Sequence, residues 1–239
     1  MIKGTTQPTL PFNYTAIVFD MDGVIFDSEV AVMNCWLELA AKYGIKDIMK
    51  PYMASIGTTV ARTREIMLAE YGSSFPYDEY AKEASIMYHK KYDGGKLPMK
   101  KGVVELLEYL KNDGKKIALA SSTRRQTVMN QLRDADILKY FDAVICGDMV
   151  GKSKPAPDIF LKACEEINEL PENTYAIEDS YNGIRAAHIG GLRPIMIPDL
   201  LPEDEEMEKL AEVILTDLLE VKEYLDTVSY THLTLPTIA

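Results

Sequence analysis

The sequence has 239 residues, with 26 Lys and Arg against 37 Asp and Glu, which gives a net charge of −11 at pH 7. The 47% hydrophobic and 26% charged fractions are typical of a globular protein and exclude a disordered or fibrous one. The acidic balance argues against binding to nucleic acid or to an anionic membrane, because both need a basic surface. No apolar run is long enough to span a bilayer.

The cysteines and the first residues indicate the compartment. Cys35, Cys146 and Cys164 are widely spaced and form no Cys-x-x-Cys pair, so neither a disulfide framework nor a zinc site is expected. Residues 1–13 are polar and lack the apolar core of a signal peptide. We therefore expect a cytoplasmic protein. No segment determines its oligomeric state, and the expectation is a monomer or a weak homodimer.

Short apolar runs typical of buried parallel strands recur along the chain. They are residues 15–20, 116–120, 142–146, 175–177, 194–197 and 211–215. Helical patterns lie between them, for example Val103, Leu106, Leu107 and Leu110 at i, i+3, i+4 and i+7. Strands that alternate with helices predict right-handed βαβ units. The fold class is therefore α/β, with a Rossmann-like, doubly wound parallel sheet.

Residues 29–96 interrupt this alternation, because only helical patterns occur there, separated by Gly and Pro. Open α/β sheets bind ligands beyond the carboxyl ends of their strands, and the insertion follows the first strand directly. We therefore expect residues 29–96 to form a helical cap domain over that edge. Residues 14–28 and 97–226 then form the α/β catalytic core.

The last residues, 227–239, differ from the rest of the chain. They contain no Asp, Glu, Lys or Arg and do not continue the helical pattern before them. Their sequence is similar to translated vector or adaptor sequence. We predict that this tail is non-native and disordered.

The first predicted strand ends in an acidic motif. Asp20 lies two residues before Asp22, and Gly23 follows. One carboxylate at such an edge can act as a nucleophile and the other as a proton donor. A simple strand-terminating turn would also explain the pattern. A calcium loop is a weaker alternative, because Phe26 is apolar and no Glu closes the loop at the proper position.

Three later strands also end in polar motifs. Ser121-Ser122-Thr123 offers hydroxyls and amides for an anion, although Thr123 could equally be the N-cap of the next helix. Lys154 lies in a Pro-rich loop and could be a plain exposed lysine. Glu178 and Asp179 form an acid pair that would suit Mg²⁺, or that would cap a helix.

The motifs Asp-x-Asp-Gly, Ser/Thr, Lys-Pro and Glu-Asp-Ser occur in this order, each at the end of a predicted strand. This ordered set resembles the haloacid dehalogenase superfamily, and specifically its phosphatase and β-phosphoglucomutase-like branch with a helical cap. The resemblance extends to about residue 226. It implies a Mg²⁺-dependent phosphatase or phosphomutase that acts on a small phosphorylated metabolite, such as a sugar phosphate, through an aspartyl-phosphate.

The resemblance also implies a role for each motif residue. Asp20 would attack phosphorus, and Asp22 would protonate the leaving oxygen and then activate water. Ser121 would hydrogen-bond the phosphoryl oxygens, and Lys154 would neutralise negative charge. The implied magnesium ligands are Asp20, the main-chain carbonyl of Asp22, Asp179 and Glu178, the last either as a ligand or as a support.

Further contacts to phosphate or substrate are expected from less specific positions. In the core they are Ser122 and Arg124, the latter at the start of a predicted helix. In the cap they are Thr58, Thr59 and Arg62, which follow Gly57. Arg62 could equally be a solvated helix charge.

The motifs do not separate a phosphatase from a phosphomutase. The β-phosphoglucomutase branch carries a His on its first cap helix, where this sequence has Val32, so hydrolysis is favoured and the mutase remains the alternative. A phospho-receiver signalling module is a more distant alternative, because receivers lack the second acid and the helical insertion. A catalytically inactive homologue is disfavoured because every motif residue is present.

Overall fold

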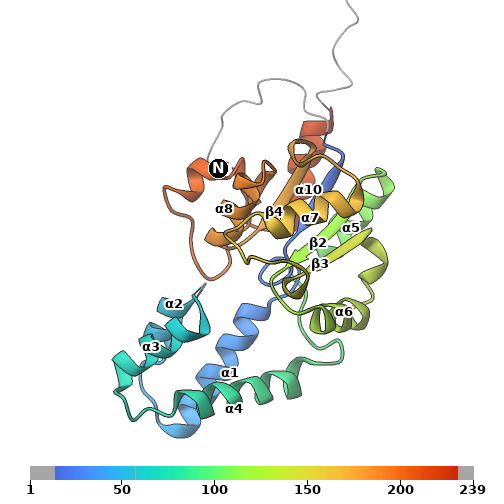
Figure 1. Ribbon diagram of the computed structural model, residues 1–239. Helices are drawn as coiled ribbons and strands as arrows, with labels where there is room; N and C mark the ends of the chain where they lie inside the picture. Colours follow the sequence, from blue (N-terminus) through green and yellow to red (C-terminus); the bar gives the residue numbers. More distant parts are fainter. Residues whose placement is uncertain (1–13, 57, 231–239) are drawn as a thin grey trace, which may run out of the picture. The chain divides into compact units, whose positions relative to one another are not determined.

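The structure is a computed structural model that describes residues 14–56 and 58–230. The chain divides into two compact units, of which one is Asp27–Pro98 and the other contains the chain before and after it (Figure 1). The division lies two residues outside each predicted cap boundary, at 29 and 96. The two units are described separately below.

The larger unit contains a six-stranded sheet with the order β3-β2-β1-β4-β5-β6, and every neighbouring pair is parallel. The strands are β1 (Ala16–Phe19), β2 (Lys116–Ser121), β3 (Ala143–Cys146), β4 (Thr174–Glu178), β5 (Arg193–Met196) and β6 (Val213–Ile214). All six were predicted from their apolar runs. The order is that of a doubly wound Rossmann-like sheet, so the predicted fold class is confirmed.

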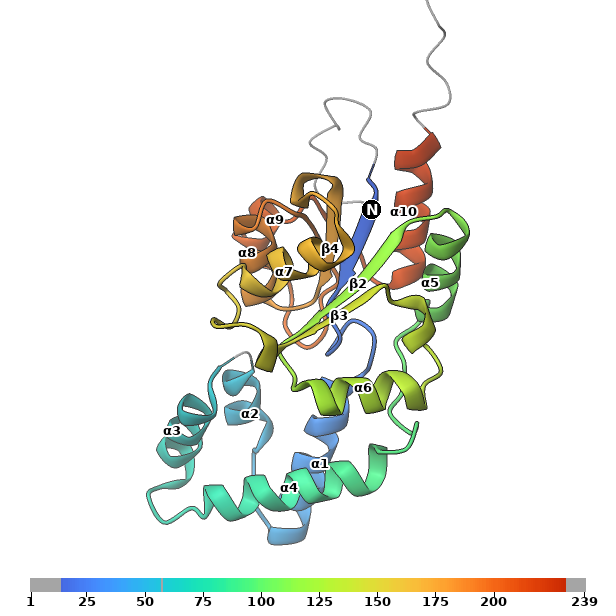
Figure 2. The same ribbon diagram turned by 45° about the vertical axis from the view of Figure 1, so that its right-hand side comes forward.

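Helices cover both faces of this sheet. They are α5 (Val103–Asn112), α6 (Arg125–Asp134), α7 (Asp158–Ile167), α8 (Tyr181–Ile189), α9 (Met207–Leu210) and α10 (Leu218–Tyr230). Figure 2 shows α7 and α8 on one side of the sheet and α5 and α10 on the other. Single 3₁₀ turns are η1 (Leu138–Tyr140), η2 (Gly147–Met149) and η3 (Pro171–Asn173).

The core explains why the strands are apolar throughout. Ala16, Val18 and Ala118 are buried in one cluster with the apolar face of α7, which contributes Phe160 and Ala163 among others. A strand covered by helices on both sides has no solvent-facing position, and this removes the alternation of polar and apolar residues. Polar side chains therefore gather where the strands end.

The smaller unit is entirely helical in its described residues, as expected for the insertion. It consists of α1 (Ser28–Tyr43), α2 (Met49–Ser55), α3 (Val60–Tyr71) and α4 (Tyr77–Tyr92). Trp36 lies at its centre, and its ring contacts those of Tyr52, Tyr77 and Tyr80. The hydroxyl of Tyr80 donates to the main-chain oxygen of Trp36 at 2.6 Å. This unit thus has an aromatic core of its own.

The predicted disorder was wrong for residues 227–230, whereas the non-native origin of the tail stays a prediction. Helix α10 continues through Tyr230, and the Thr227 hydroxyl donates to the Glu223 main-chain oxygen at 3.0 Å. A threonine hydroxyl that bonds to the carbonyl four residues earlier is compatible with a helix. The absence of charged residues after Asp226 therefore did not mark the end of α10. Residues 231–239 lie outside the described part of the chain. Among the described helices, none is both long and apolar enough to cross a membrane.

Candidate active site

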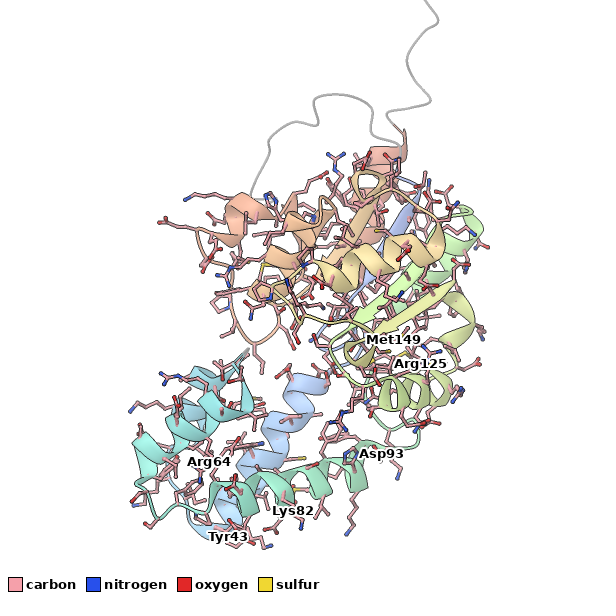
Figure 3. All side chains as sticks on the ribbon, viewed as in Figure 1. Tyr43, Arg64, Lys82, Asp93, Arg125 and Met149 are labelled. Atoms are coloured by element: carbon pink, nitrogen blue, oxygen red, sulfur yellow. The ribbon has the colours of Figure 1, made fainter. Side chains whose placement is uncertain are left out.

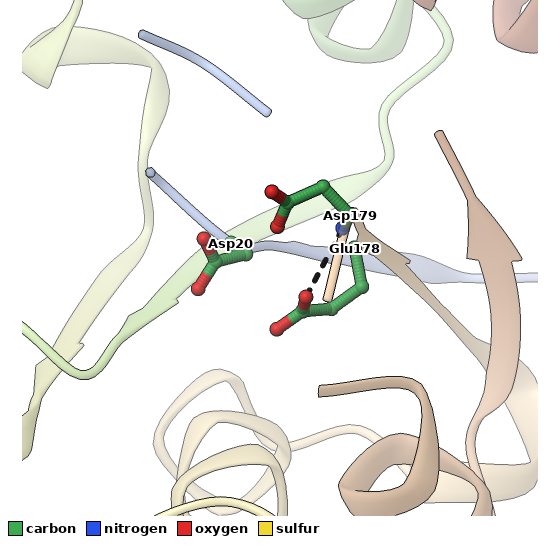
Figure 4. A group of neighbouring side chains, drawn as sticks. All are labelled: Asp20, Glu178 and Asp179. Carbon is green, nitrogen blue, oxygen red and sulfur yellow. Dashed lines mark hydrogen bonds between the residues drawn. The ribbon is translucent and has the colours of Figure 1, made fainter. Parts of the chain in front are cut away.

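Three acids meet at the carboxyl ends of β1 and β4. Asp20 directly follows β1, Glu178 is the last residue of β4, and Asp179 comes next. Because Phe19 pairs with Ile177 in the parallel register, the residues that follow reach the same sheet edge. One carboxylate oxygen from each acid lies within 4.8 Å of the others (Figure 4). Asp20 and Glu178 are buried.

The Lys154 ammonium lies between two of these acids. Its Nζ donates to Asp20 Oδ1 at 2.5 Å, to Glu178 Oε1 at 2.6 Å and to the Ala120 main-chain oxygen at 3.0 Å. Only 8% of the Lys154 side chain is exposed. The following Lys154–Pro155 peptide bond is cis. Lys154 is therefore part of the acidic cluster, and the alternative of an exposed loop lysine is wrong.

The cluster has more carboxylates than positive charges, and this shifts the pKa values of its members. Burial raises the pKa of Asp20 to about 8; Lys154 opposes this shift, while Glu178 and Asp22 add to it. Burial disfavours the charged form of Lys154, but the carboxylates of Asp20 and Glu178 outweigh it and raise the pKa of Lys154. One ammonium thus serves several carboxylates, and a further cation would be favourable at this edge.

Glu178 is held by hydrogen bonds at both carboxylate oxygens. Oε1 accepts from Lys154, and Oε2 accepts from the main-chain N–H groups of Asp179 and Ser180 at 3.1 and 3.0 Å and from the Ser180 hydroxyl at 2.9 Å. The Ser180 hydroxyl also accepts from Gly183 N–H and caps α8. Helix α8 and Lys154 therefore fix the position of Glu178.

Two glycines, which have no side chain, make room for the carboxylates of Glu178 and Asp179. A Cβ on Gly183 would lie 1.9 Å from the carboxylate carbon of Glu178, and a Cβ on Gly23 would lie 2.1 Å from Asp179 Oδ2. Gly23 also has a φ of +79°, which favours glycine. The cluster thus depends on glycine at both positions.

We expect Gly183→Ala to destabilise the protein, although alanine is the better helix former. The gain in helix propensity is about 1 kcal/mol. The clash with a carboxylate that cannot move should cost roughly 1–3 kcal/mol or more and should displace Lys154 as well. Denaturant unfolding should show a net loss. In Gly151→Ala the new Cβ has no atom within 4 Å, so that control should change little, and equal effects would contradict the account.

Asp22 lies in the loop after β1 and faces the end of β2. Its Oδ2 accepts from the Thr123 hydroxyl at 2.9 Å and lies 3.5 Å from the hydroxyl of Ser121, the buried last residue of β2. The Thr123 N–H donates to Ser121 Oγ at 3.1 Å. The structure thus brings Asp22 and Ser121 together, as the motifs indicated, and adds Thr123.

Thr123 is the site residue that sequence reasoning missed. The alternative that Thr123 caps the next helix does not hold, because α6 begins at Arg125, and Asp148 accepts the N–H of Arg125 at 3.1 Å. The available signal was the run of three hydroxyl residues at the strand end. The prediction assigned Ser121 and Ser122 to phosphate or substrate and considered Thr123 only as a possible helix cap.

The side chains of Ser122 and Arg124 are exposed. The guanidinium of the neighbouring Arg125 donates to the Val144 main-chain oxygen at 3.2 Å and lies against Met149 (Figure 3). Substrate contacts by Ser122 and Arg124 therefore stay predictions.

The predicted cap residues are bonded within their own unit. Thr59 is the N-cap of α3 and accepts the N–H of Arg62 at 3.2 Å. Thr58 donates to the Ser55 main-chain oxygen at 2.7 Å, and the exposed Arg62 guanidinium lies 2.8 Å from Glu65. Thr59 thus has a structural task. Contact of these three residues with a substrate stays a prediction.

The donor set fits a hard divalent cation. The clustered atoms of Asp20, Glu178 and Asp179 are carboxylate oxygens, which Mg²⁺ prefers, and the described part of the cluster contains neither a thiolate nor an imidazole. Asp179 is the least buried of the three acids. A carboxylate nucleophile, a second acid, hydroxyl donors and an ammonium together suit transfer of a phosphoryl group.

Comparison with known proteins agrees with this chemistry. A family model described as haloacid dehalogenase-like hydrolase matches residues 17–197. The "Phosphorylated carbohydrates phosphatase" of Thermotoga maritima is 32% identical over 75% of this chain and 83% of its own length. Hexitol phosphatase B of Escherichia coli is 26% identical over 88% of this chain and 96% of its own.

Solved structures give the same result. A putative β-phosphoglucomutase from Thermotoga maritima superposes with a TM-score of 0.74 at 28% identity, covering 89% of this chain and 99% of its own. CbbY from Rhodobacter sphaeroides in complex with phosphate has a TM-score of 0.68 at 27% identity, covering 87% and 96%. The chain belongs to the haloacid dehalogenase-like hydrolases and is a phosphohydrolase of the phosphatase and phosphomutase type.

Proposed function

We propose that this protein is a Mg²⁺-dependent phosphatase that hydrolyses a small phosphomonoester through an aspartyl-phosphate on Asp20. The observation that carries the proposal is the position of the Lys154 ammonium, 2.5 Å from Asp20 and 2.6 Å from Glu178 at the sheet edge. A nucleophilic carboxylate must approach a dianionic phosphate, and this requires a fixed positive charge beside both.

The reaction divides into two steps. In the first, an Asp20 carboxylate oxygen bonds to phosphorus as the ester P–O bond breaks, and Asp22 gives its proton to the departing alcohol oxygen. In the second, Asp22 takes a proton from water, whose oxygen bonds to phosphorus as the bond to Asp20 breaks. Ser121 and Lys154 bind the phosphoryl oxygens during both steps. At the end of the second step, the Asp20 carboxylate and the protonated Asp22 are regenerated, and the alcohol and phosphate have been released.

We assign the metal to the carboxylates of Asp20 and Asp179 and to the main-chain carbonyl of Asp22. When bound there, Mg²⁺ supplies neutralising charge for the phosphoryl group. Glu178 is assigned to the support of this site, because both of its oxygens already accept hydrogen bonds from Lys154 and the start of α8.

Mg²⁺ should stabilise the protein without any substrate. A ligand at 100 times its Kd raises the free energy of unfolding by about 2.7 kcal/mol. In Asp179→Asn this shift should largely disappear, whereas the exposed Asp113→Asn should keep it. Thermal unfolding with and without Mg²⁺ measures both. An undiminished shift in Asp179→Asn would remove Asp179 from the metal site.

The substrate class is proposed from the relatives. Two of them are named for phosphorylated carbohydrates and for hexitol phosphates, which supports a sugar or hexitol phosphate. A phosphomutase is the second candidate, because a structural relative is described as a putative β-phosphoglucomutase. The chain has Val32 where that branch carries a His, which supports hydrolysis.

The test is a panel of hexose and hexitol phosphates, assayed with Mg²⁺ for both free phosphate and isomerised product. We expect free phosphate to be the main product. With β-glucose 1-phosphate and a bisphosphate activator, accumulation of glucose 6-phosphate would show the mutase instead. Absence of both products across the panel would contradict the proposed substrate class.

A further inference from the structure

Thr123 connects the two loops that carry the proposed acid and the proposed phosphate-binding serine. Its hydroxyl donates to Asp22 Oδ2 at 2.9 Å, and its N–H donates to Ser121 Oγ at 3.1 Å. Asp22 belongs to the loop after β1, and Ser121 ends β2. Thr123 thus bonds to both groups, which also approach each other directly, with Ser121 Oγ 3.5 Å from Asp22 Oδ2.

We propose that Thr123 is a positioning residue, whose hydroxyl holds the Asp22 carboxyl group in the orientation that protonates the leaving oxygen of an alkyl phosphate. The inference rests on the proposed function and deepens it. A hydrogen bond at Oδ2 limits rotation of the Asp22 carboxyl group. The bond to Thr123 therefore sets the plane in which this group meets the leaving oxygen.

The surrounding contacts separate this role from a structural one. Helix α6 does not use the Thr123 hydroxyl, because Asp148 accepts the first free N–H of that helix. The Thr123 main chain is held independently: its carbonyl accepts from Gly147 N–H at 3.1 Å, and Gly147 packs so closely that a Cβ there would lie 2.2 Å from the Ser122 oxygen. Removal of the hydroxyl should therefore leave the loop in place.

Two classes of substrate distinguish the roles. An alkoxide is a poor leaving group, so an alkyl phosphate needs proton donation as its ester bond breaks. The 4-nitrophenolate anion is stable and leaves without a proton. A residue that positions the general acid should therefore matter for the first substrate and hardly for the second. A residue that only maintains the fold or binds phosphate should matter for both.

The experiment compares kcat/KM of wild type and Thr123→Val on two substrates, because this ratio reports the steps through departure of the alcohol. The substrates are p-nitrophenyl phosphate and the hexose or hexitol phosphate that the wild type hydrolyses fastest. We expect a loss of roughly 10- to 100-fold on the sugar phosphate. On p-nitrophenyl phosphate the loss should stay below about 3-fold.

Two variants serve as references. Thr123→Ser retains the hydroxyl and should recover most of the sugar phosphate activity. Thr127→Val makes the same chemical change within α6, one turn beyond Thr123, and should resemble the wild type on both substrates. Thermal unfolding of each variant confirms that it is folded.

The outcomes are separable. Equal losses on both substrates, or no loss on the sugar phosphate, would overturn the positioning role while leaving the proposed phosphatase intact. Failure of Thr123→Ser to recover activity would also overturn it. Absence of hydrolysis by the wild type would contradict the proposed function and the inference together.

Discussion

Asp20→Asn is expected to abolish phosphate release from every substrate that the wild type hydrolyses. The amide keeps the shape of the side chain but is not a nucleophile, and loss of a catalytic nucleophile lowers turnover by roughly 10⁴- to 10⁶-fold. The fold should survive, because the variant removes one negative charge from a buried cluster in which Lys154 serves several carboxylates. Phosphate release and thermal unfolding measure the two effects.

The matched control is Asp113→Asn. Asp113 is exposed and pairs with Lys115 at 3.3 Å; it precedes the amino end of β2, whereas the motif residue Ser121 ends that strand. Its activity should equal that of the wild type. Residual turnover above about 1% in Asp20→Asn, with an unchanged control, would assign the nucleophile to another group.

Lys154→Met should have the second largest effect, on stability and on activity at once. Removal of one partner from a buried ion pair costs about 3–5 kcal/mol, because the carboxylates of Asp20 and Glu178 would remain buried with their charge uncompensated. Turnover should fall by roughly 10²- to 10³-fold, since the charge beside the phosphoryl group is lost. Denaturant unfolding and phosphate release measure the two quantities.

The chain provides both a control and a coupling test for Lys154. Lys101 forms a pair of similar length with Asp217, 2.6 Å, but 71% of its side chain is exposed, so Lys101→Met should cost less than about 1 kcal/mol. Lys154→Met combined with Glu178→Gln should lose less stability than the two changes summed, by about 1–3 kcal/mol. Simple additivity would show that these two side chains do not depend on each other.

Much of the core and its acidic cluster was predictable because buried parallel strands have a plain sequence signature. Six apolar runs gave six strands, and once β1 and β4 are neighbours, Asp20 and Glu178 must share an edge. The pairing itself does not follow from the runs. It depends on the crossover order, for which the motif resemblance supplied the expectation.

The sequence was less informative where function depends on a specific hydrogen bond. Thr123 and Ser121 belong to one hydroxyl run, and only the path of the loop shows which of them reaches Asp22 at 2.9 Å. Glu178 and Asp179 are likewise adjacent acids, but Glu178 points into Lys154 and α8. Neighbouring residues of the same chemical type thus have different roles because their side chains point in different directions. Composition and spacing do not determine these directions.

The tail and the cap mark two other limits. Residues 227–230 have no charged side chain, and α10 nevertheless continues through Tyr230. In the cap, Thr59 and Arg62 have partners within α3, and a substrate contact would have to compete with them. A motif that both caps a helix and could bind a ligand cannot be assigned from sequence alone.

If Asp20 is the nucleophile, it becomes phosphorylated during turnover, and trapping the aspartyl-phosphate tests this most directly. In Asp22→Asn the water of the second step is no longer activated, while p-nitrophenyl phosphate still donates its phosphoryl group without an acid. Rapid acid quench followed by peptide mass spectrometry should find one phosphoryl group on the peptide that contains Asp20. A burst of nitrophenol with no phosphoryl group on that peptide, or with the group on another residue, would contradict the account.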